Sequence, residues 1–267
     1  MKEILIDNLK RVVRGDLKTV YSRLRWFVRF RRSRRLAQAI VESSGSAIQG
    51  GPFAGMSYLQ WAVGSELCPK LVGSYECELN PALTRVFERG YDTVVNIGCG
   101  EGYYAVGLAL RLPGARVYAF DTDPAARESC ELLARSNGVS GRVTVGGECT
   151  PSRLRELLAG QSFVICDCEG CELHLLRPEL VPELARADIL VELHDFIDPS
   201  ISGTITSRFA LTHEITTIKS AARDPSHYPV LRRFRASDRR FALDEDRPAG
   251  MEWAFMERRA DGARSRE

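Results

Sequence analysis

The sequence lacks any long hydrophobic run. No stretch of its 267 residues approaches the roughly 20 consecutive apolar residues that a membrane-spanning helix needs. The N-terminal part also lacks the continuous apolar core of a signal peptide, because charged side chains interrupt it repeatedly. These side chains are Arg11, Arg14, Asp16, Lys18 and Arg23. The sequence therefore predicts a soluble protein of the cytoplasm.

The chain also shows no internal repeat and no low-complexity tract. With 44% hydrophobic and 27% charged residues it can bury a full core, and its length suits one large domain or one domain with an extension. It contains 8 cysteines. Without an export signal, these cysteines are expected to be reduced thiols rather than a disulfide framework.

Positive charge is concentrated at the N-terminus. Residues 1–35 contain 12 Lys and Arg against 3 acidic residues, so they carry +9, and the rest must carry −7 to reach the total of +2. Residues 1–45 are predicted to form a basic amphipathic helical extension, broken or bent near Gly15, because apolar residues recur at spacings of three and four. These are Leu5, Leu9, Val12, Val13, Leu17, Val20, Tyr21, Leu24 and Phe27.

Two interpretations of this basic helix stay open. It can pack on its own domain with a solvated basic face, which is the favoured interpretation because charge asymmetry alone is weak evidence for a partner. Alternatively, it can contact an anionic membrane surface or an acidic partner.

Residues 46–90 are rich in glycine and aromatic side chains, too apolar for a free linker. The segment is expected to pack over the ligand site of the main domain. Within it, Tyr75, Glu76 and Glu78 either close over that ligand or cap a helix.

From residue 91 to residue 257 the pattern alternates between short apolar runs and helical stretches, which predicts a mostly parallel sheet covered by helices. Strands are predicted at 93–97, 116–120, 142–145, 163–166, 189–193, 213–218 and 252–256. Helices are predicted at 103–112, 124–137, 151–159 and 172–187. The arginine-rich stretch between the last two strands is interpreted as a solvated insertion or a lid, and 258–267 as a flexible tail.

The stretch "NIGCGEGYY" joins the first predicted strand to a helix through a glycine turn. Gly98, Gly100 and Gly102 have the spacing G-x-G-x-G, and Tyr103 stands where a dinucleotide-binding turn has its third glycine. This argues against NAD and FAD. The Gly-Lys-Ser/Thr ending of an ATP-binding loop is absent as well.

Carboxylates follow the next strands. Asp121 ends the second strand, where it can accept hydrogen bonds from both hydroxyl groups of a ribose. Glu148 follows the third strand and is expected near an adenine edge. Asp167 follows the fourth strand at the carboxyl edge of the sheet, where ligands of open α/β sheets bind.

At this point the chain resembles the class I methyltransferases, whose signature is the G-x-G-x-G turn followed by an acidic residue at the end of the second strand. The resemblance covers residues 91–257. It implies a Rossmann-like α/β fold with a seven-stranded sheet in the order 3-2-1-4-5-7-6, helices on both faces, and S-adenosyl-L-methionine as the cofactor. The cofactor-binding residues are then Asn96, Gly98, Gly100, Gly102, Asp121, Glu148 and Asp167.

Within that superfamily, "ICDCEGCELHLL" is similar to the D-x-E-G-x-E segment of FkbM-type enzymes, many of which methylate hydroxyl or carboxylate oxygens. This implies O-methylation of a small-molecule or glycan acceptor. No nucleic-acid partner is expected, because the net charge of −7 outside residues 1–35 disfavours a broad phosphate-binding surface.

Methyl transfer to oxygen requires an aligned acceptor and removal of its proton, and imidazole is the first candidate base near neutral pH. His194 follows the fifth strand in "VELHDF". We predict that His194 is this base, oriented by Glu192, with Asp167 on the neighbouring strand end. The alternative is that His194 and Asp195 only cap the following segment.

Metal binding at the same edge is a less favoured interpretation. Asp167, Glu192, His194 and Asp195 offer ligands that suit Mg²⁺ or Mn²⁺, but their spacing matches no defined site, so no metal is predicted. The run Cys166, Cys168, Cys171 lacks a fourth nearby ligand for zinc. Arg208 and His213 are expected at the surface or core edge rather than in an acceptor pocket.

Three functions remain from sequence alone. The first is a methyltransferase, the second is a cyclase or lyase that consumes S-adenosylmethionine on the same fold, and the third is a non-catalytic cofactor-binding scaffold. The residues do not indicate the acceptor or the oligomeric state.

Overall fold

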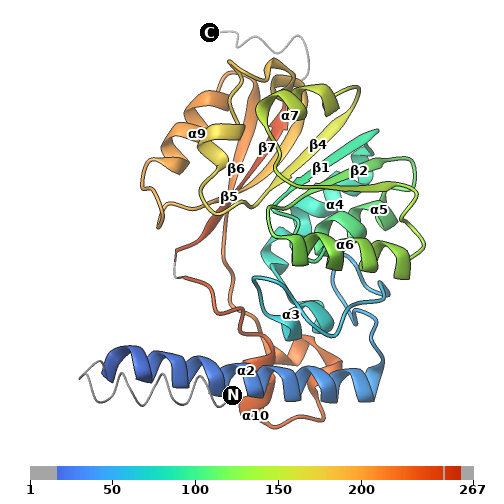
Figure 1. Cartoon of the computed structure of the whole chain (residues 1–267), viewed down its shortest axis with the longest axis vertical. Helices are drawn as coiled ribbons and strands as arrows, with labels where there is room; N and C mark the ends of the chain where they lie inside the picture. The colour runs from blue at the N-terminus through green and yellow to red at the C-terminus, as the bar shows by residue number, and fades with distance from the viewer. Residues whose placement is uncertain (1–16, 249, 260–267) are drawn as a thin grey trace.

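The computed structural model describes residues 17–248 and 250–259. Its centre is a seven-stranded sheet in the order β3-β2-β1-β4-β5-β7-β6 (Figure 1). Strands β1 to β5 pair in parallel, whereas β7 runs antiparallel to β5 and β6. The strands are β1 (Thr93–Ile97), β2 (Arg116–Phe120), β3 (Val143–Gly146), β4 (Ser162–Cys166), β5 (Asp188–Leu193), β6 (His213–Lys219) and β7 (Glu252–Arg258). The predicted sheet and strand order are confirmed.

Two core layers cover the two faces of the sheet. Because side chains alternate along a strand, Val94 and Phe163 pack with α4, α5 and α6, whereas Val95 and Val164 pack with α7, α8 and α9. The α-helices are α2 (Leu17–Ser44), α3 (Leu67–Val72), α4 (Asn80–Arg89), α5 (Tyr103–Arg111), α6 (Pro124–Ser136), α7 (Pro151–Leu157), α8 (Glu172–Leu175), α9 (Ile201–Phe209) and α10 (Ala236–Ala242). The 3-10 helices are η1 (Cys77–Leu79), η2 (Pro182–Arg186), η3 (Pro225–His227) and η4 (Pro229–Leu231).

The helix predicted over 172–187 is wrong. α8 ends at Leu175, and only the 3-10 helix η2 follows before β5. Pro178 and Pro182 explain the break, because proline has no N–H for an intrahelical hydrogen bond and disfavours helical backbone in the preceding residue.

The insertion between β6 and β7 packs against α2, as Figure 1 shows for α10. Arg29 donates a hydrogen bond of 2.8 Å to Asp244, and Arg32 donates one of 2.7 Å to Asp238. The Arg32 guanidinium also lies 4.4 Å from the ring centre of Phe241. The insertion is therefore a packed layer rather than only a solvated loop.

From residue 17 the predicted N-terminal extension is helical and packs on its own chain through Leu36, Ala37 and Ile40. Residues 1–16, with the predicted bend at Gly15, and most of the predicted tail lie outside the described residues. Within the described ranges, no helix combines the length and the apolar character needed to cross a bilayer.

Candidate functional site

The glycine turn after β1 lies against the end of β4. Gly98 has a φ of +74°, and a Cβ at this position would stand 1.5 Å from the carbonyl oxygen of Asp167. Only glycine permits this approach. The N–H of Gly100 donates a hydrogen bond of 2.8 Å to Asp121, so the turn is tied to β2 as well.

Glu101, inside the turn, holds the preceding segment in place. Its buried carboxylate accepts hydrogen bonds from Lys70 (2.5 Å), the Tyr58 hydroxyl (2.7 Å) and the Val63 N–H (2.9 Å). Burial alone would raise the pKa of Glu101, but Lys70 and these hydrogen bonds outweigh it and lower the pKa below its ordinary value. The segment from Tyr58 to Lys70 is thereby fastened to the glycine turn.

Four other residues were predicted to hold the cofactor: Gly102, with a φ of +99°, precedes α5, and the others lie on β1 or just after β2 and β3. Asn96 is buried, and its side-chain oxygen has no hydrogen-bond partner. Asp121 is partly exposed, and its second oxygen accepts from the Asp123 N–H at 2.9 Å. Glu148 is exposed. Their binding of a cofactor stays a prediction.

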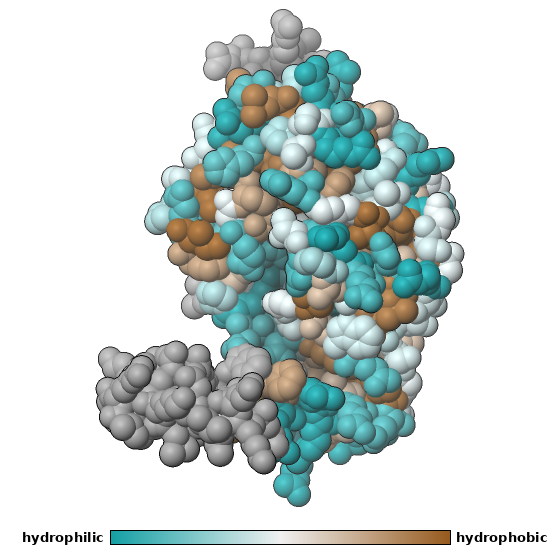
Figure 2. Space-filling view, in the orientation of Figure 1, coloured by the Kyte–Doolittle hydropathy of each residue, from teal (hydrophilic) through white to brown (hydrophobic). Residues whose placement is uncertain are grey.

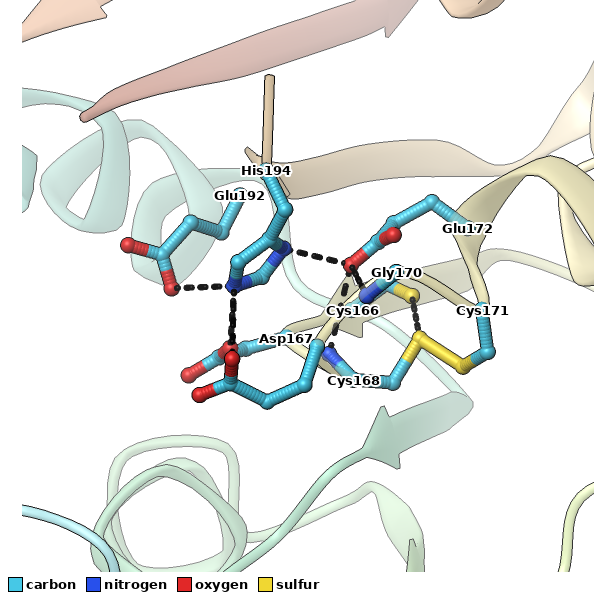
Figure 3. Close-up of a disulfide and its surroundings, with 9 residues drawn as sticks. Cys166, Asp167, Cys168, Gly170, Cys171, Glu172, Glu192 and His194 are labelled. Carbon is cyan, nitrogen blue, oxygen red and sulfur yellow. Dashed lines mark hydrogen bonds and ion pairs between the residues drawn. A yellow bond between two sulfur atoms is a disulfide. The ribbon is translucent and has the colours of Figure 1, made fainter. Parts of the chain in front are cut away.

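His194 directly follows β5 and is fully buried. Its Nδ1 lies 2.7 Å from the buried carboxylate of Glu172, the first residue of α8 (Figure 3). A carboxylate only accepts, so Nδ1 carries the proton and Nε2 of the neutral ring has a free lone pair. Burial lowers the pKa of His194, but Glu172 and then Asp167 outweigh it, and the pKa is raised.

Nε2 of His194 faces three carboxylates from two strand ends. It lies 3.5 Å from Asp167 Oδ1 and 3.6 Å from Glu192 Oε2 (Figure 3), and 3.9 Å from Glu169 Oε2. None of these contacts is a hydrogen bond, and Nε2 is buried without a hydrogen-bond partner. The structure therefore brings the predicted residues Asp167, Glu192 and His194 together.

Arg247 is a residue of this cluster that the sequence did not indicate. Its guanidinium donates a hydrogen bond of 2.7 Å to Glu192 and pairs with Glu76, which also accepts from the Tyr104 hydroxyl. Arg247 and Glu192 are 55 residues apart, so no local pattern links them. Glu76 stands at the N-cap position of η1, but its buried side chain makes no capping hydrogen bond there and belongs to this network instead.

Glu192 and Glu76 hold their protons more tightly than ordinary carboxylates. Burial, and then the charge of Asp167, raise the pKa of Glu192 to about 11, against the opposing charge of Arg247. Burial raises the pKa of Glu76 to about 7, again opposed by Arg247. Burial and the neighbouring acids therefore favour the protonated forms of Glu192 and Glu76.

Three residues other than glycine have a positive φ in the described chain: Glu76 (46°), Glu169 (54°) and Asp246 (54°). Each is a member of the cluster or lies next to one in the sequence. Such conformations cost about 1–3 kcal/mol each and persist only where the surroundings enforce them. The strained backbone of the described residues is thus concentrated around this site.

The loop after β4 contains a disulfide between Cys168 and Cys171 (Figure 3). This corrects the prediction that the cysteines are reduced thiols. The other six, Cys68, Cys77, Cys99, Cys130, Cys149 and Cys166, are free. Because the disulfide closes the loop between Asp167 and Glu172, it restrains the segment from which both carboxylates project.

Three further residues have structural contacts. Asp195 accepts a hydrogen bond from the Ser202 N–H at 2.8 Å, so it caps the following segment and lies outside the His194 cluster. Arg208 donates to the carbonyl oxygen of Leu173, and His213 contacts that of Ala187.

Figure 2 shows a recess between the part of the molecule that carries the sheet and the part that carries α2. The surface within this recess is hydrophilic.

Two curated relatives share short regions with the chain. It is 38% identical over 73 residues to a release factor glutamine methyltransferase of Chlorobaculum tepidum, which covers 26% of this chain and 25% of that relative. It is 34% identical over 98 residues to a ribosomal protein L11 methyltransferase of Bacillus cereus, which covers 37% of this chain and 30% of that relative. The matches thus span less than a third of these relatives. No family model matches the chain.

Solved structures with a similar arrangement include an rRNA methylase from Streptococcus thermophilus, with 13% identity, a TM-score of 0.46, and coverage of 68% of this chain and 96% of that one. An O-methyltransferase from Bacillus cereus in complex with SAH has 14% identity, a TM-score of 0.43, and coverage of 65% and 77%.

The predicted partners need correction. A small-molecule or glycan acceptor and the absence of nucleic acid were expected, but the curated relatives are named for a ribosomal protein and a release factor. That prediction is wrong.

The sheet order and the glycine turn followed by Asp121 match those expected for the class I methyltransferases. The antiparallel β7 completes the sheet. The chain has the fold of the class I S-adenosylmethionine-dependent methyltransferases.

Proposed function

We propose that this protein is an S-adenosylmethionine-dependent methyltransferase that methylates an oxygen atom of a protein. The observation that carries the proposal is the contact between Gly98 and Asp167, because it joins the glycine turn and the His194 cluster at one edge of the sheet. A cofactor held at the turn would therefore lie beside the ionisable groups.

The residues present fit this cofactor. Asp121 has a partly exposed carboxylate for ribose hydroxyls, and Asn96 has a buried side-chain oxygen without a partner. Around Gly100, a Cβ would meet only the carbonyl oxygen of Val63, at 3.6 Å, so the backbone stays open to a close ligand. When bound, S-adenosylmethionine supplies an electrophilic methyl group.

The chain's own residues would position and activate the acceptor. His194 offers a free lone pair at Nε2, and Glu172 holds the ring in the orientation that directs it into the site. An acceptor oxygen placed there loses its proton as the new carbon–oxygen bond forms. Much of the rate would come from alignment of this oxygen with the methyl group.

The choice of acceptor draws on two observations. The D-x-E-G-x-E segment at Asp167 is similar to that of FkbM-type enzymes, which supports oxygen as the methylated atom. The named substrates of both curated relatives are proteins, which makes a protein the first acceptor to test.

The test is incubation of the purified chain with methyl-labelled S-adenosylmethionine and a cell extract separated into protein, RNA and metabolite fractions. We expect label in the protein fraction together with S-adenosylhomocysteine, and loss of labelling in the His194→Gln variant but not in Asp195→Asn. Label in RNA would show that the chain is a methyltransferase whose acceptor is RNA rather than protein. Methylthioadenosine without transferred label would indicate a cyclase or lyase, and an unchanged cofactor would indicate a scaffold.

A further inference from the structure

We propose that Asp167, Glu192 and His194 form a binding site for a divalent cation, for which Mn²⁺ is the probe. Each residue offers one ligand atom, and these atoms all lie within 4.8 Å of one another. Two carboxylate oxygens and one imidazole nitrogen combine ligands that Mg²⁺ and Mn²⁺ prefer with one that transition metals prefer. Mn²⁺ suits the mixture.

The strongest observation is the orientation of His194. The ring is fully buried, and Nε2 points among carboxylates without a hydrogen-bond partner. A buried polar atom is rarely left in this state. The other nitrogen donates to Glu172 at 2.7 Å, which is the arrangement that usually orients a metal-binding histidine.

The distances agree with a shared ion. Nε2 lies 3.5 Å from Asp167 Oδ1 and 3.6 Å from Glu192 Oε2, too far for hydrogen bonds. An ion about 2.1 Å from two ligand atoms holds them about 3.0 to 3.5 Å apart at bond angles of about 90 to 109°. The two separations from Nε2 need to contract only slightly.

Charge also favours a cation. Asp167, Glu172, Glu192 and Glu76 lie in or next to the cluster, and among the described residues Arg247 is the only arginine or lysine that pairs with any of them. Arg247 bonds to the other oxygen of Glu192, Oε1, which leaves Oε2 directed toward His194. The acidic side chains thus outnumber the cations that pair with them, and a divalent ion would add positive charge at this position.

The site has an open side. The Asp167 side chain is 27% exposed and that of Glu169 is 76% exposed, so an ion can enter from solvent. Three protein ligands leave positions for water or an acceptor oxygen, as in catalytic metal sites. If the proposed function holds, a bound ion would replace the base role of His194: Nε2 would be a ligand, the ion would polarise the acceptor hydroxyl, and water or Glu169 would receive its proton.

The experiment is a titration of the full chain, freed of metal and without cofactor, with Mn²⁺ followed by electron paramagnetic resonance. We expect one bound Mn²⁺ per chain with a magnetic coupling to one imidazole nitrogen. Glu172→Gln should lower the affinity about 10-fold to 100-fold, and Asp167→Asn and His194→Gln by more. Asp195→Asn, which changes a neighbouring carboxylate outside the ligand set, should bind normally. Thermal melting checks that each variant folds.

Absence of Mn²⁺ binding, absence of the nitrogen coupling, or binding that survives His194→Gln would each overturn the metal site. Methyl transfer that persists after chelation would show that the ion has no role in the transfer. The protein would still be a methyltransferase, with His194 as a simple base. Specific Mn²⁺ binding without methyl transfer to any fraction would retain the site and remove the proposed function.

Discussion

Gly98 and Asp167 are in backbone contact, so that a single added carbon on Gly98 would overlap the carbonyl oxygen of Asp167. This contact ties the turn after β1 to the end of β4, two strands that are adjacent in the sheet but far apart in the sequence. The position of the His194 cluster relative to the turn depends on it.

Replacement of Gly98 by alanine should therefore destabilise the fold. The new side chain would overlap the Asp167 backbone at a positive φ, and we expect a loss of about 2 to 5 kcal/mol in the free energy of unfolding. Chemical denaturation measures this loss. Gly114→Ala is the control, because nothing lies within 4 Å of its added carbon, and it should change stability by less than about 1 kcal/mol. Equal effects of both substitutions would contradict the packing argument.

The pair Lys70–Glu101 should be essential for stability. Both side chains are buried, so Glu101→Gln leaves the Lys70 charge without compensation, and we expect a loss of about 3 to 5 kcal/mol. Glu156→Gln breaks the exposed pair with Arg153 and should cost less than about 0.5 kcal/mol. Urea unfolding measures the free energy of unfolding of both variants. A small effect of Glu101→Gln would argue against a rigid attachment of the segment from Tyr58 to Lys70 to the glycine turn.

His213 should make the protein less stable in mild acid. Burial is the largest cause that lowers its pKa, and because Ala187 offers a carbonyl, Nε2 must donate while Nδ1 accepts from Thr212. Below about pH 6.5, His213 therefore binds a proton in the unfolded chain but not in the folded chain. Stability is complete above that pH and falls by up to about 1.4 kcal/mol per unit as the pH decreases toward the folded pKa.

Denaturation at about pH 7.5 and about pH 5.5 tests this prediction, since the two values lie on either side of the ordinary histidine pKa. His213→Gln should be less stable at the higher pH and should lose less stability on acidification. If the stability of His213→Gln falls as steeply with decreasing pH as that of the unchanged protein, other groups cause the acid sensitivity.

Asp121 should matter for cofactor affinity. If its carboxylate accepts the ribose hydroxyls, Asp121→Asn should weaken binding of S-adenosylhomocysteine about tenfold or more, measured by calorimetry. Asp123→Asn removes a nearby charge that caps α6 and should leave affinity within about threefold, because asparagine is an equally good cap. If both variants bind equally well, the ribose contact is absent.

The disulfide can be counted directly. Alkylation of the denatured chain without a reductant should modify six cysteines, and reduction beforehand should raise the number to eight. Mass spectrometry of the peptide that spans Cys168 and Cys171 locates the difference. Modification of all eight before reduction would restore the prediction of reduced thiols.

Local sequence patterns were enough to predict the sheet and the glycine turn. Every predicted strand lies within two residues of its observed ends, because buried strands and G-x-G-x-G turns are local patterns. The sequence also placed Asp167, Glu192 and His194 at one edge, since the carboxyl ends of neighbouring parallel strands meet there. The prediction of a long helix at 172–187 was wrong because two prolines outweighed its apolar periodicity.

The tertiary structure alone decided how these groups interact. Glu172 orients His194 across 22 residues of sequence, and Arg247 reaches Glu192 from a segment beyond α10. The disulfide was also decided there, because two thiols pair only when the folded loop brings them close. Contacts between distant segments depend on how helices and loops pack on the sheet, and no short stretch of sequence encodes that packing.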